Sequence, residues 1–149
     1  MCNVEYYLKD AHVRDKAFIY QTKRESIKKY VEAIWGWDEA NQSKYFEDDF
    51  ALITNFKVIW FDDEAVGFLE TYESDELVNI TEIHINPAAQ GKGIGSRIIN
   101  DIVRKAKECS KKVTLGCFKE NDRAIRLYQR LGFRITEETE THFVMECQK

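Results

Sequence analysis

Apolar and polar residues follow helical spacing through most of the first third of the chain. A short apolar stretch at Val4–Leu8 predicts a strand, and spaced apolar positions among mixed charges predict helices around Val13–Ile34 and Glu39–Glu47. We therefore expect this third to be mostly helical.

The middle of the chain changes to a pattern rich in strand-forming residues. Phe56–Phe61, Ala65–Tyr72 and Leu77–Asn86 are predicted strands, separated by the polar turns Asp62-Asp63-Glu64 and Glu73–Glu76. Such short connections join antiparallel neighbours, so we expect a three-stranded meander.

The third of these strands carries an irregularity. Its apolar positions are even-numbered at Val78 and Ile80 but odd-numbered at Ile83 and Ile85. A β-bulge near Thr81-Glu82 would explain the slip, and bulges are common beside active sites. The alternative is a strand that is buried on both faces and has no bulge.

The second half returns to helical spacing. A helix is predicted from about Gly93 to Cys109 with one apolar stripe, formed by Ile94, Ile98, Ile99, Ile102, Val103 and Ala106. A strand at Val113–Phe118 follows, and then a helix that Asn121 can cap and Gly132 can close.

The last predicted elements form a hairpin of Phe133–Glu137 with His142–Cys147. Antiparallel hairpins combined with a helical crossover predict an α+β fold, in which a mixed, mostly antiparallel central sheet is flanked by helices on both faces. The chain has 149 residues, one proline and no Gly/Ser-rich stretch, so we expect residues 1–149 to form a single domain.

Composition argues against several classes of function. With 44% apolar and 32% charged residues the protein is globular, and a net charge of −4 with interspersed Lys and Arg argues against nucleic-acid binding. The four cysteines are widely separated and lack a C-x-x-C pair, so no metal site is expected. The chain shows neither an apolar signal segment nor a membrane-spanning run, which predicts a cytoplasmic protein without membrane contact.

Three of the seven glycines lie between Ala89 and Ser96, where a predicted strand meets a predicted helix. Glycine lets the backbone approach a ligand closely, and the free N–H groups of a helix start attract phosphate. The glycines stand at positions 91, 93 and 95, which matches neither a G-x-G-x-x-G nor a G-x-x-x-x-G-K-[ST] loop. A diphosphate ligand of another kind is indicated.

The pattern Gln-x-x-Gly-x-Gly at 90–95 resembles the acetyl-CoA pyrophosphate loop of the GNAT superfamily. The pattern Asn-x-x-Ala-x-x-x-Tyr-x-x-x-Gly-Phe at 121–133 resembles the next signature of that family, and the likeness extends over about residues 77–137. The resemblance implies an N-acetyltransferase that moves an acetyl group from acetyl-CoA to a primary amine by direct attack in a ternary complex. It also leaves open a homodimer formed through the late strands.

The resemblance implies mainly backbone roles in binding the cofactor. The main chain of Ile83, His84 and Ile85 would pair with the pantetheine arm. Backbone amides of the loop would hold the pyrophosphate, namely those of Gln90, Gly91, Lys92, Gly93, Ile94, Gly95 and Ser96. The Lys92 side chain either pairs with a phosphate of coenzyme A or is simply solvated.

Asn121 and Tyr128 are seven residues apart, so on one helix they share a face and lie about 10 Å apart along its axis. By the resemblance, Asn121 would steady pantetheine and Tyr128 would donate a proton to the departing thiolate. The alternatives are that Asn121 is only a helix cap and that Tyr128 is only a core aromatic.

The attacking amine must first lose its ammonium proton, which Glu82, His84 or a water path can accept. Glu82 matches the acidic residue that many relatives carry at this place, so we expect Glu82 and Tyr128 to be the catalytic pair. The alternative is that both Glu82 and His84 are ordinary solvated side chains.

The junction of the first two predicted helices places two indoles beside two carboxylates, those of Trp35, Trp37, Asp38 and Glu39. Indole faces and carboxylates both attract ammonium groups, and the resemblance places the acceptor site near these helices. Alternatively, the indoles pack under the loop and the carboxylates cap the next helix.

Two other functions stay open from the sequence. The chain could be a noncatalytic acyl-CoA-binding module of the same fold, or an interaction domain that uses the tryptophan-rich junction. The identity of the acceptor is also open among polyamines, aminoglycosides, amino acids, peptide N-termini and lysines.

Overall fold

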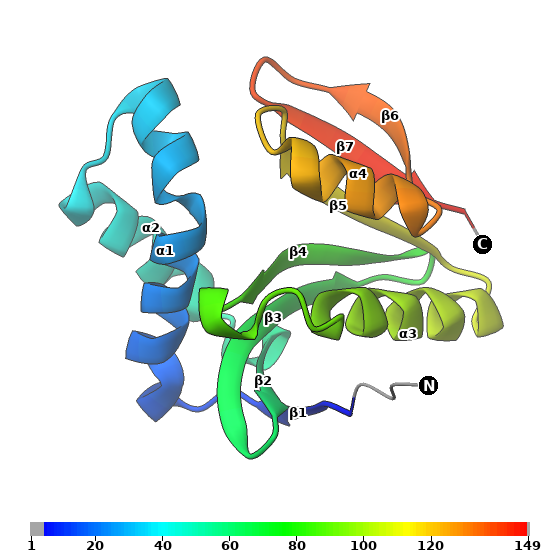
Figure 1. Cartoon of the computed structure of the whole chain (residues 1–149), viewed down its shortest axis with the longest axis horizontal. Coiled ribbons are helices and arrows are strands. Elements are labelled where there is room, and N and C mark those ends of the chain that lie inside the picture. The colour runs from blue at the N-terminus through cyan, green and yellow to red at the C-terminus, as the bar shows by residue number, and fades with distance from the viewer. Residues whose placement is uncertain (1–4, 149) are drawn as a thin grey trace. The chain divides into compact units, whose positions relative to one another are not determined.

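The computed structural model describes residues 5–148, which form four α-helices, three short 3-10 helices and seven strands (Figure 1). The α-helices are α1 (Lys16–Trp35), α2 (Glu39–Phe50), α3 (Ile94–Glu108) and α4 (Asp122–Arg130). The 3-10 helices are η1 (Val13–Asp15), η2 (Ile53–Asn55) and η3 (Pro87–Ala89). The strands are β1 (Tyr7–Asp10), β2 (Phe56–Phe61), β3 (Glu64–Glu73), β4 (Leu77–Ile85), β5 (Lys112–Phe118), β6 (Arg134–Glu138) and β7 (His142–Cys147).

All of these strands belong to one sheet, in the order β1-β2-β3-β4-β5-β7-β6. β4 and β5 pair in parallel, whereas β1 with β2, β2 with β3, β5 with β7 and β6 with β7 pair antiparallel. The predicted α+β fold with a mixed, mostly antiparallel sheet is confirmed. Across residues 5–148, no helix combines the length and the apolar character needed to cross a membrane.

Most predicted elements begin and end within three residues of the observed ones. The first strand is displaced: the apolar pattern predicts Val4–Leu8, part of which lies outside the described residues, whereas β1 covers Tyr7–Asp10. Pairing with β2 decides the difference, because the register begins with Tyr7 opposite Trp60. Pairing with β2, a strand about fifty residues later in the chain, thus sets the position of β1 more strongly than the local apolar pattern does.

The bulge expected near Thr81-Glu82 stays a prediction. β4 is continuous from Leu77 to Ile85. Register shifts appear elsewhere in the sheet, between Ile59 and Trp60 in the β2–β3 ladder and between Ile135 and Glu137 in the β6–β7 ladder.

The described chain divides into two compact units, one of residues 5–70 with 83–94 and the other of residues 71–82 with 95–148. The first unit contains α1, α2 and the glycine segment up to the start of α3. The second contains most of α3 together with β5, α4, β6 and β7. That the chain behaves as a single domain stays a prediction.

The core of the first unit is a cluster of aromatic and aliphatic side chains from α1, α2, β2 and β3. Ile19 of α1 is fully buried, and Phe46 and Phe50 of α2 pack against Phe56 of β2, with ring centroids 6.4 and 5.1 Å apart. Phe68 of β3 lies next to Phe56, at 6.1 Å. This packing explains why α2 runs past the predicted end at Glu47, since the extra turn buries Phe50.

The turn between β2 and β3 shows how local chemistry sets the register of the sheet. Asp62 and Asp63 both have positive φ, 54° and 62°, between the paired residues Phe61 and Glu64. Positive φ at both central residues is the signature of a type I′ hairpin turn, and Asp is one of the few non-glycine residues that tolerates it. The turn predicted at Asp62-Asp63-Glu64 is confirmed.

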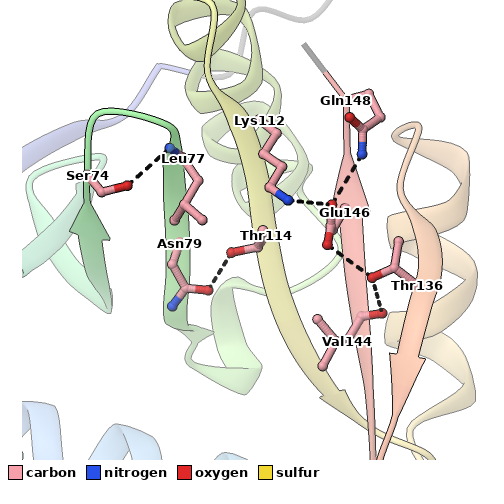
Figure 2. Close-up of polar contacts among 9 residues, drawn as sticks. All are labelled: Ser74, Leu77, Asn79, Lys112, Thr114, Thr136, Val144, Glu146 and Gln148. Carbon is pink, nitrogen blue, oxygen red and sulfur yellow. Dashed lines mark hydrogen bonds and ion pairs between the residues drawn. The ribbon is translucent and has the colours of Figure 1, made fainter.

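In the second unit, polar side chains tie β5 to the strands on both of its sides (Figure 2). Thr114 Oγ1 donates to Asn79 Oδ1 of β4 at 2.7 Å. Lys112 Nζ lies 3.1 Å from Glu146 Oε1 of β7, and Thr136 of β6 donates to Glu146 Oε2 at 3.2 Å. These contacts fix the early part of β5 in the sheet and supplement its backbone ladders.

The two ladders of β5 differ in length. The parallel ladder with β4 runs from Leu77 opposite Lys112 to Ile80 opposite Leu115. The antiparallel ladder with β7 continues to Phe118, which lies opposite His142. The carboxyl end of β5 is therefore held by β7, beyond the last pair that it forms with β4.

Replacing Glu146 with glutamine is expected to lower the free energy of unfolding by about 1 kcal/mol at neutral pH. The hydrogen bond from Lys112, more than any other contact, lowers the pKa of the Glu146 carboxyl below its ordinary value. Because its folded pKa lies below the unfolded one, this stabilisation is present above the unfolded pKa and is lost as the pH falls through the folded pKa.

Urea unfolding of both proteins between neutral and acid pH tests this prediction. The difference between wild type and Glu146→Gln should shrink as the solution is acidified, and Glu108→Gln, at an exposed position on α3, serves as a matched control with little effect. A difference for Glu146 that does not change with pH would contradict the argument.

Replacing Gly67 with alanine is expected to destabilise the protein by about 2–3 kcal/mol. A Cβ added there would lie 2.0 Å from the carbonyl oxygen of His84, and this obstacle is backbone. Gly116→Ala is the control, because its Cβ would meet the Phe143 carbonyl oxygen only at 3.9 Å. Equal thermal unfolding midpoints for the two variants would show that β3 and β4 can separate freely at Gly67.

Candidate active site

The glycine segment leaves β4 through a fixed turn. The backbone N–H of Asn86 donates to the Val66 carbonyl at 2.8 Å, and the short helix η3 follows. The side-chain amide of Gln90 then reaches back and donates to the Ile85 carbonyl at 2.8 Å. This hydrogen bond from Gln90 therefore fixes the start of the loop against the end of β4.

Two loop glycines adopt a backbone conformation that L side chains rarely take. Gly91 has φ +80° and Gly93 has φ +81°, and both are exposed, as is Lys92 between them. A Cβ on Gly91 would meet nothing within 4 Å, so the requirement for glycine there is conformational and not a matter of space inside the protein. The loop presents bare main chain to solvent.

α3 begins directly after this exposed main chain. Ile94, Ile98 and Ile99 are each at most 2% exposed, which confirms the apolar stripe predicted for the helix. Its buried face anchors the helix, and the N–H groups of its first turn, which include Gly95 and Ser96, follow the exposed glycines. Exposed glycine main chain leading into a long helix fits a diphosphate group.

The basic side chains near the loop have partners within the protein. The Lys92 ammonium lies 5.8 Å from the centroid of the Phe61 ring, in the same unit. Arg97 Nε lies 3.5 Å from the Asp101 carboxylate one turn along α3. Both side chains are exposed, so a phosphate group would compete with weak surface contacts only.

The end of β4 is partly buried at Ile83, His84 and Ile85. The His84 ring lies 5.3 Å from the Phe68 ring, and its carbonyl oxygen is the atom that faces Gly67. Of the main-chain groups expected to meet pantetheine, the Ile85 carbonyl already accepts the Gln90 amide. His84 therefore has a packing role in the first unit.

Tyr128 lies on α4 in the second unit, with its ring 6.1 Å from that of Phe133. Burial is the largest cause that raises the pKa of the Tyr128 phenol, and the charges of Cys117 and Glu82 raise it further. The phenol therefore keeps its proton throughout the neutral range and can act as a hydrogen-bond or proton donor.

Asn121 caps α4, as the alternative prediction has it. Its side-chain oxygen accepts from the Ala124 N–H at 3.2 Å. At the other end of the helix, Gly132 has φ +98° and the Phe133 N–H donates to the Tyr128 carbonyl at 3.0 Å, so glycine closes the helix as predicted. A role for Asn121 toward pantetheine would use its side-chain nitrogen.

Glu82 belongs to an electrostatic cluster that the sequence does not reveal. The charge of the partly buried Glu82 carboxylate acts on Tyr128 and also on His142, at the start of β7. The fourth member is Cys117, where burial raises the pKa of the thiol to about 11. Sixty positions separate Glu82 from His142, so only the strand order could have pointed to the pair.

The tryptophan-rich junction is engaged within the first unit. Asp38 caps α2 by accepting from the Asn41 N–H at 3.1 Å. Glu39 accepts hydrogen bonds from the Tyr20 hydroxyl and, at 2.8 Å, from Arg24 Nε.

The two indoles at this junction differ in exposure. The Trp35 side chain is 62% exposed, whereas Trp37 is partly buried and has the Arg24 guanidinium 5.7 Å from its ring centroid. The Trp37 ring and the Glu39 carboxylate thus both contact the guanidinium of Arg24, a cation of the protein itself. Substrate contact at this junction stays a prediction.

Comparison with known proteins identifies the family to which this sequence is similar. Residues 17–133 match the model of the acetyltransferase (GNAT) family. The chain is 36% identical over 55 residues to the L-methionine sulfoximine/L-methionine sulfone acetyltransferase of Salmonella typhimurium, a stretch that covers 36% of this chain and 32% of that protein. It is 30% identical over 90 residues to the spermine/spermidine N(1)-acetyltransferase of Bacillus subtilis, covering 54% and 59%.

Both matches span less than two thirds of the relative's own length. Among solved structures, the PaiA N-acetyltransferase of Thermoplasma acidophilum, in complex with coenzyme A, superposes with a TM-score of 0.75. That comparison covers 97% of this chain and 99% of the other at 16% identity, which shows a shared fold. Since the family match extends over most of the sequence and the fold agrees with it, the chain belongs to the GNAT acetyltransferase family.

Proposed function

We propose that this protein transfers the acetyl group of acetyl-CoA to a primary amine by direct attack in a ternary complex. The observation that carries the proposal is the exposed turn at Gly91 and Gly93, both at positive φ, which leads straight into the buried stripe of α3. In a member of this family, bare main chain at a helix start is suited to the pyrophosphate of the cosubstrate.

The cosubstrate would be held mainly by main-chain groups. Amides from Gln90 to Ser96 would bind the pyrophosphate, and Gln90 keeps that loop in place through its bond to the Ile85 carbonyl. The main chain of Ile83–Ile85 would pair with pantetheine as an added strand does.

Tyr128 would supply the proton that the leaving thiolate needs. When the amine attacks the thioester, the C–N bond forms, the C–S bond breaks and the sulfur gains negative charge. A tyrosine phenol holds its proton at neutral pH, and burial, which raises the pKa of Tyr128, keeps that proton available for the thiolate.

Glu82 would accept the proton of the incoming ammonium group. An alkylammonium holds its proton at neutral pH and has no lone pair for attack until a base removes it. Glu82 is partly buried, and its charge already acts on Tyr128, so a base and an acid from β4 and α4 belong to the same cluster.

Basic side chains of the first unit would limit which class of amine the protein accepts. The relatives named above act on a sulfoximine or sulfone of methionine and on spermine or spermidine. In this chain, an ammonium group could bind Glu39 only by displacing Arg24. The small cavity nearby, of about 20 Å³, includes the basic side chains of Lys23 and Arg24 in its lining. A polycationic acceptor is therefore disfavoured at this place.

Gly93→Glu is expected to abolish acetyl-CoA binding, because its carboxylate would block and repel the pyrophosphate. Isothermal titration calorimetry of the purified protein measures the effect. Gly93→Ala is the matched control, since it carries the same backbone strain at φ +81° without the charge, and it should retain measurable affinity. Folded wild-type protein that fails to bind acetyl-CoA would refute the proposed function.

Tyr128→Phe is expected to reduce kcat about 100-fold with little change in the KM for acetyl-CoA, since only the proton donor is removed. Release of free thiol, followed over a panel of amines, gives the rate. Tyr72→Phe removes a hydroxyl from an exposed side chain and should leave kcat unchanged. Wild-type protein that binds acetyl-CoA tightly yet turns over no amine would favour the noncatalytic module.

A further inference from the structure

The first unit contains an open pocket that the proposed acetyl transfer does not use. It has a volume of about 390 Å³ and lies where the start of α1 faces α2, two helices that run side by side (Figure 1). Residues of η1 and α1 line one side, and Ser43, Phe46 and Glu47 of α2 line the other. All of them belong to the first unit, and the volume is within the range of small-molecule sites.

Much of the lining of this pocket is apolar. The rings of Tyr20 and Phe46 lie 5.2 Å apart between centroids, and Phe46 belongs to the buried core of the unit. The Tyr20 hydroxyl donates to Glu39, so the polar end of this side chain already has a partner. Ala17 and Val13 complete the apolar lining, and both are exposed, Val13 to 76%. The pocket therefore offers apolar surface that the protein itself leaves uncovered.

Two polar side chains of the lining have no partner among residues 5–148. The Arg14 guanidinium forms no ion pair with a carboxylate of that range, and the Ser43 hydroxyl on the facing helix forms no hydrogen bond. Glu47, the carboxylate of the lining, is bound by Lys16. One positive charge of the pocket is thus left without a counter-charge, in a protein whose net charge is −4. This pocket favours an anion.

A smaller cavity of about 20 Å³ shares the two aromatic rings with this pocket. Its cations both have carboxylate partners. Lys23 Nζ lies 3.8 Å from the Asp49 carboxylate, and Arg24 donates to Glu39 at 2.8 Å. An anionic group is therefore attracted to the end at Arg14, which leaves the aromatic rings for an apolar group.

The pocket lies on a different side of α1 from the glycine segment. Thr22 is buried, and its hydroxyl lies 3.3 Å from Asn86 Oδ1, just before that segment begins. Two residues along an α-helix turn through about 200°, so Thr22 and Tyr20 project toward nearly opposite sides of α1. A ligand in the pocket would thus leave the glycine segment accessible.

We propose that this pocket binds a small monocarboxylate that carries an apolar chain. The carboxylate contacts the Arg14 guanidinium and the Ser43 hydroxyl, and the chain covers Val13, Ala17 and the two aromatic rings. Three observations carry the proposal: a cation without a counter-charge, a hydroxyl without a partner on the facing helix, and uncovered apolar surface in the same pocket. The site is independent of the proposed acetyl transfer.

Octanoate is the probe for this site, and its titration into ¹⁵N-labelled protein, followed through the amide NMR signals, shows where it binds. The signals of residues 13–17 and 43–47 should shift and saturate in the millimolar range. Octylamine has an eight-carbon chain with a positive charge, and butanoate has the carboxylate with a short chain. Each should bind about tenfold more weakly than octanoate, because each lacks one of the two required groups.

Arg14→Gln is expected to weaken octanoate binding about tenfold, since the charge-assisted hydrogen bond to the carboxylate is lost. Ser43→Ala should weaken it about threefold through the loss of a neutral hydrogen bond. Both side chains are exposed, so both variants should fold. Arg123→Gln removes an exposed cation from α4, in the other unit, and as the matched control should bind octanoate as wild type does.

Equal octanoate affinity of wild type and Arg14→Gln, or equal binding of octylamine, would show that the apolar surface alone holds the chain and would overturn the proposal. Shifts confined to the glycine segment or to α4, or no saturable shift up to the solubility limit of octanoate, would overturn it as well. Calorimetry separates this site from the proposed function: Arg14→Gln should bind acetyl-CoA with wild-type affinity, and octanoate should not compete. Failure of acetyl-CoA binding would refute acetyl transfer, whereas the octanoate titration still decides the pocket.

Discussion

The pairing of β5 with two neighbours over different lengths is the constraint on which the proposed chemistry depends. Its parallel ladder with β4 ends at Leu115, whereas its antiparallel ladder with β7 continues to Phe118. Polar contacts near the start of β5, from Asn79 to Thr114 and from Lys112 to Glu146, support the shared part of the sheet (Figure 2). Beyond the last β4 pair, the residues of β4 and β7 are placed by different ladders.

Burial then determines the protonation states of the ionisable side chains. The same desolvation that keeps the Tyr128 phenol and the Cys117 thiol protonated keeps the His142 imidazole neutral. A cluster with a proton donor, a carboxylate and a neutral imidazole can both give and take protons at neutral pH. Asn121 and Gly132 contribute indirectly, because they define the two ends of the helix that carries Tyr128.

The residues of the tryptophan-rich junction have structural partners in the folded chain. Two indoles beside two carboxylates suit an ammonium ligand, yet in the folded chain Arg24 binds Glu39 and lies over Trp37, while Asp38 caps α2. A cation of the protein itself, from α1, occupies this place, and contact with a substrate there stays a prediction. Residue type and spacing predicted the kind of partner, and only the packing of α1 against α2 identified it.

The sequence by itself determined the elements whose signals are local. Helical spacing predicted the buried stripe of α3, the acidic pair Asp62-Asp63 marked a turn that positive φ confirms, and the spacing of Gly91 and Gly93 predicted the exposed loop. Each of these depends on interactions within a few residues, which the order of residue types expresses directly. The family followed from the same local signatures.

Only the tertiary structure decided the features that join distant parts of the chain. The position of β1 depends on its register with β2, and the partner of Glu39 depends on how α1 lies against α2. No local pattern carries this information, because strand register and burial arise from contacts between residues far apart in the sequence, and those contacts set the pKa values on which the chemistry rests.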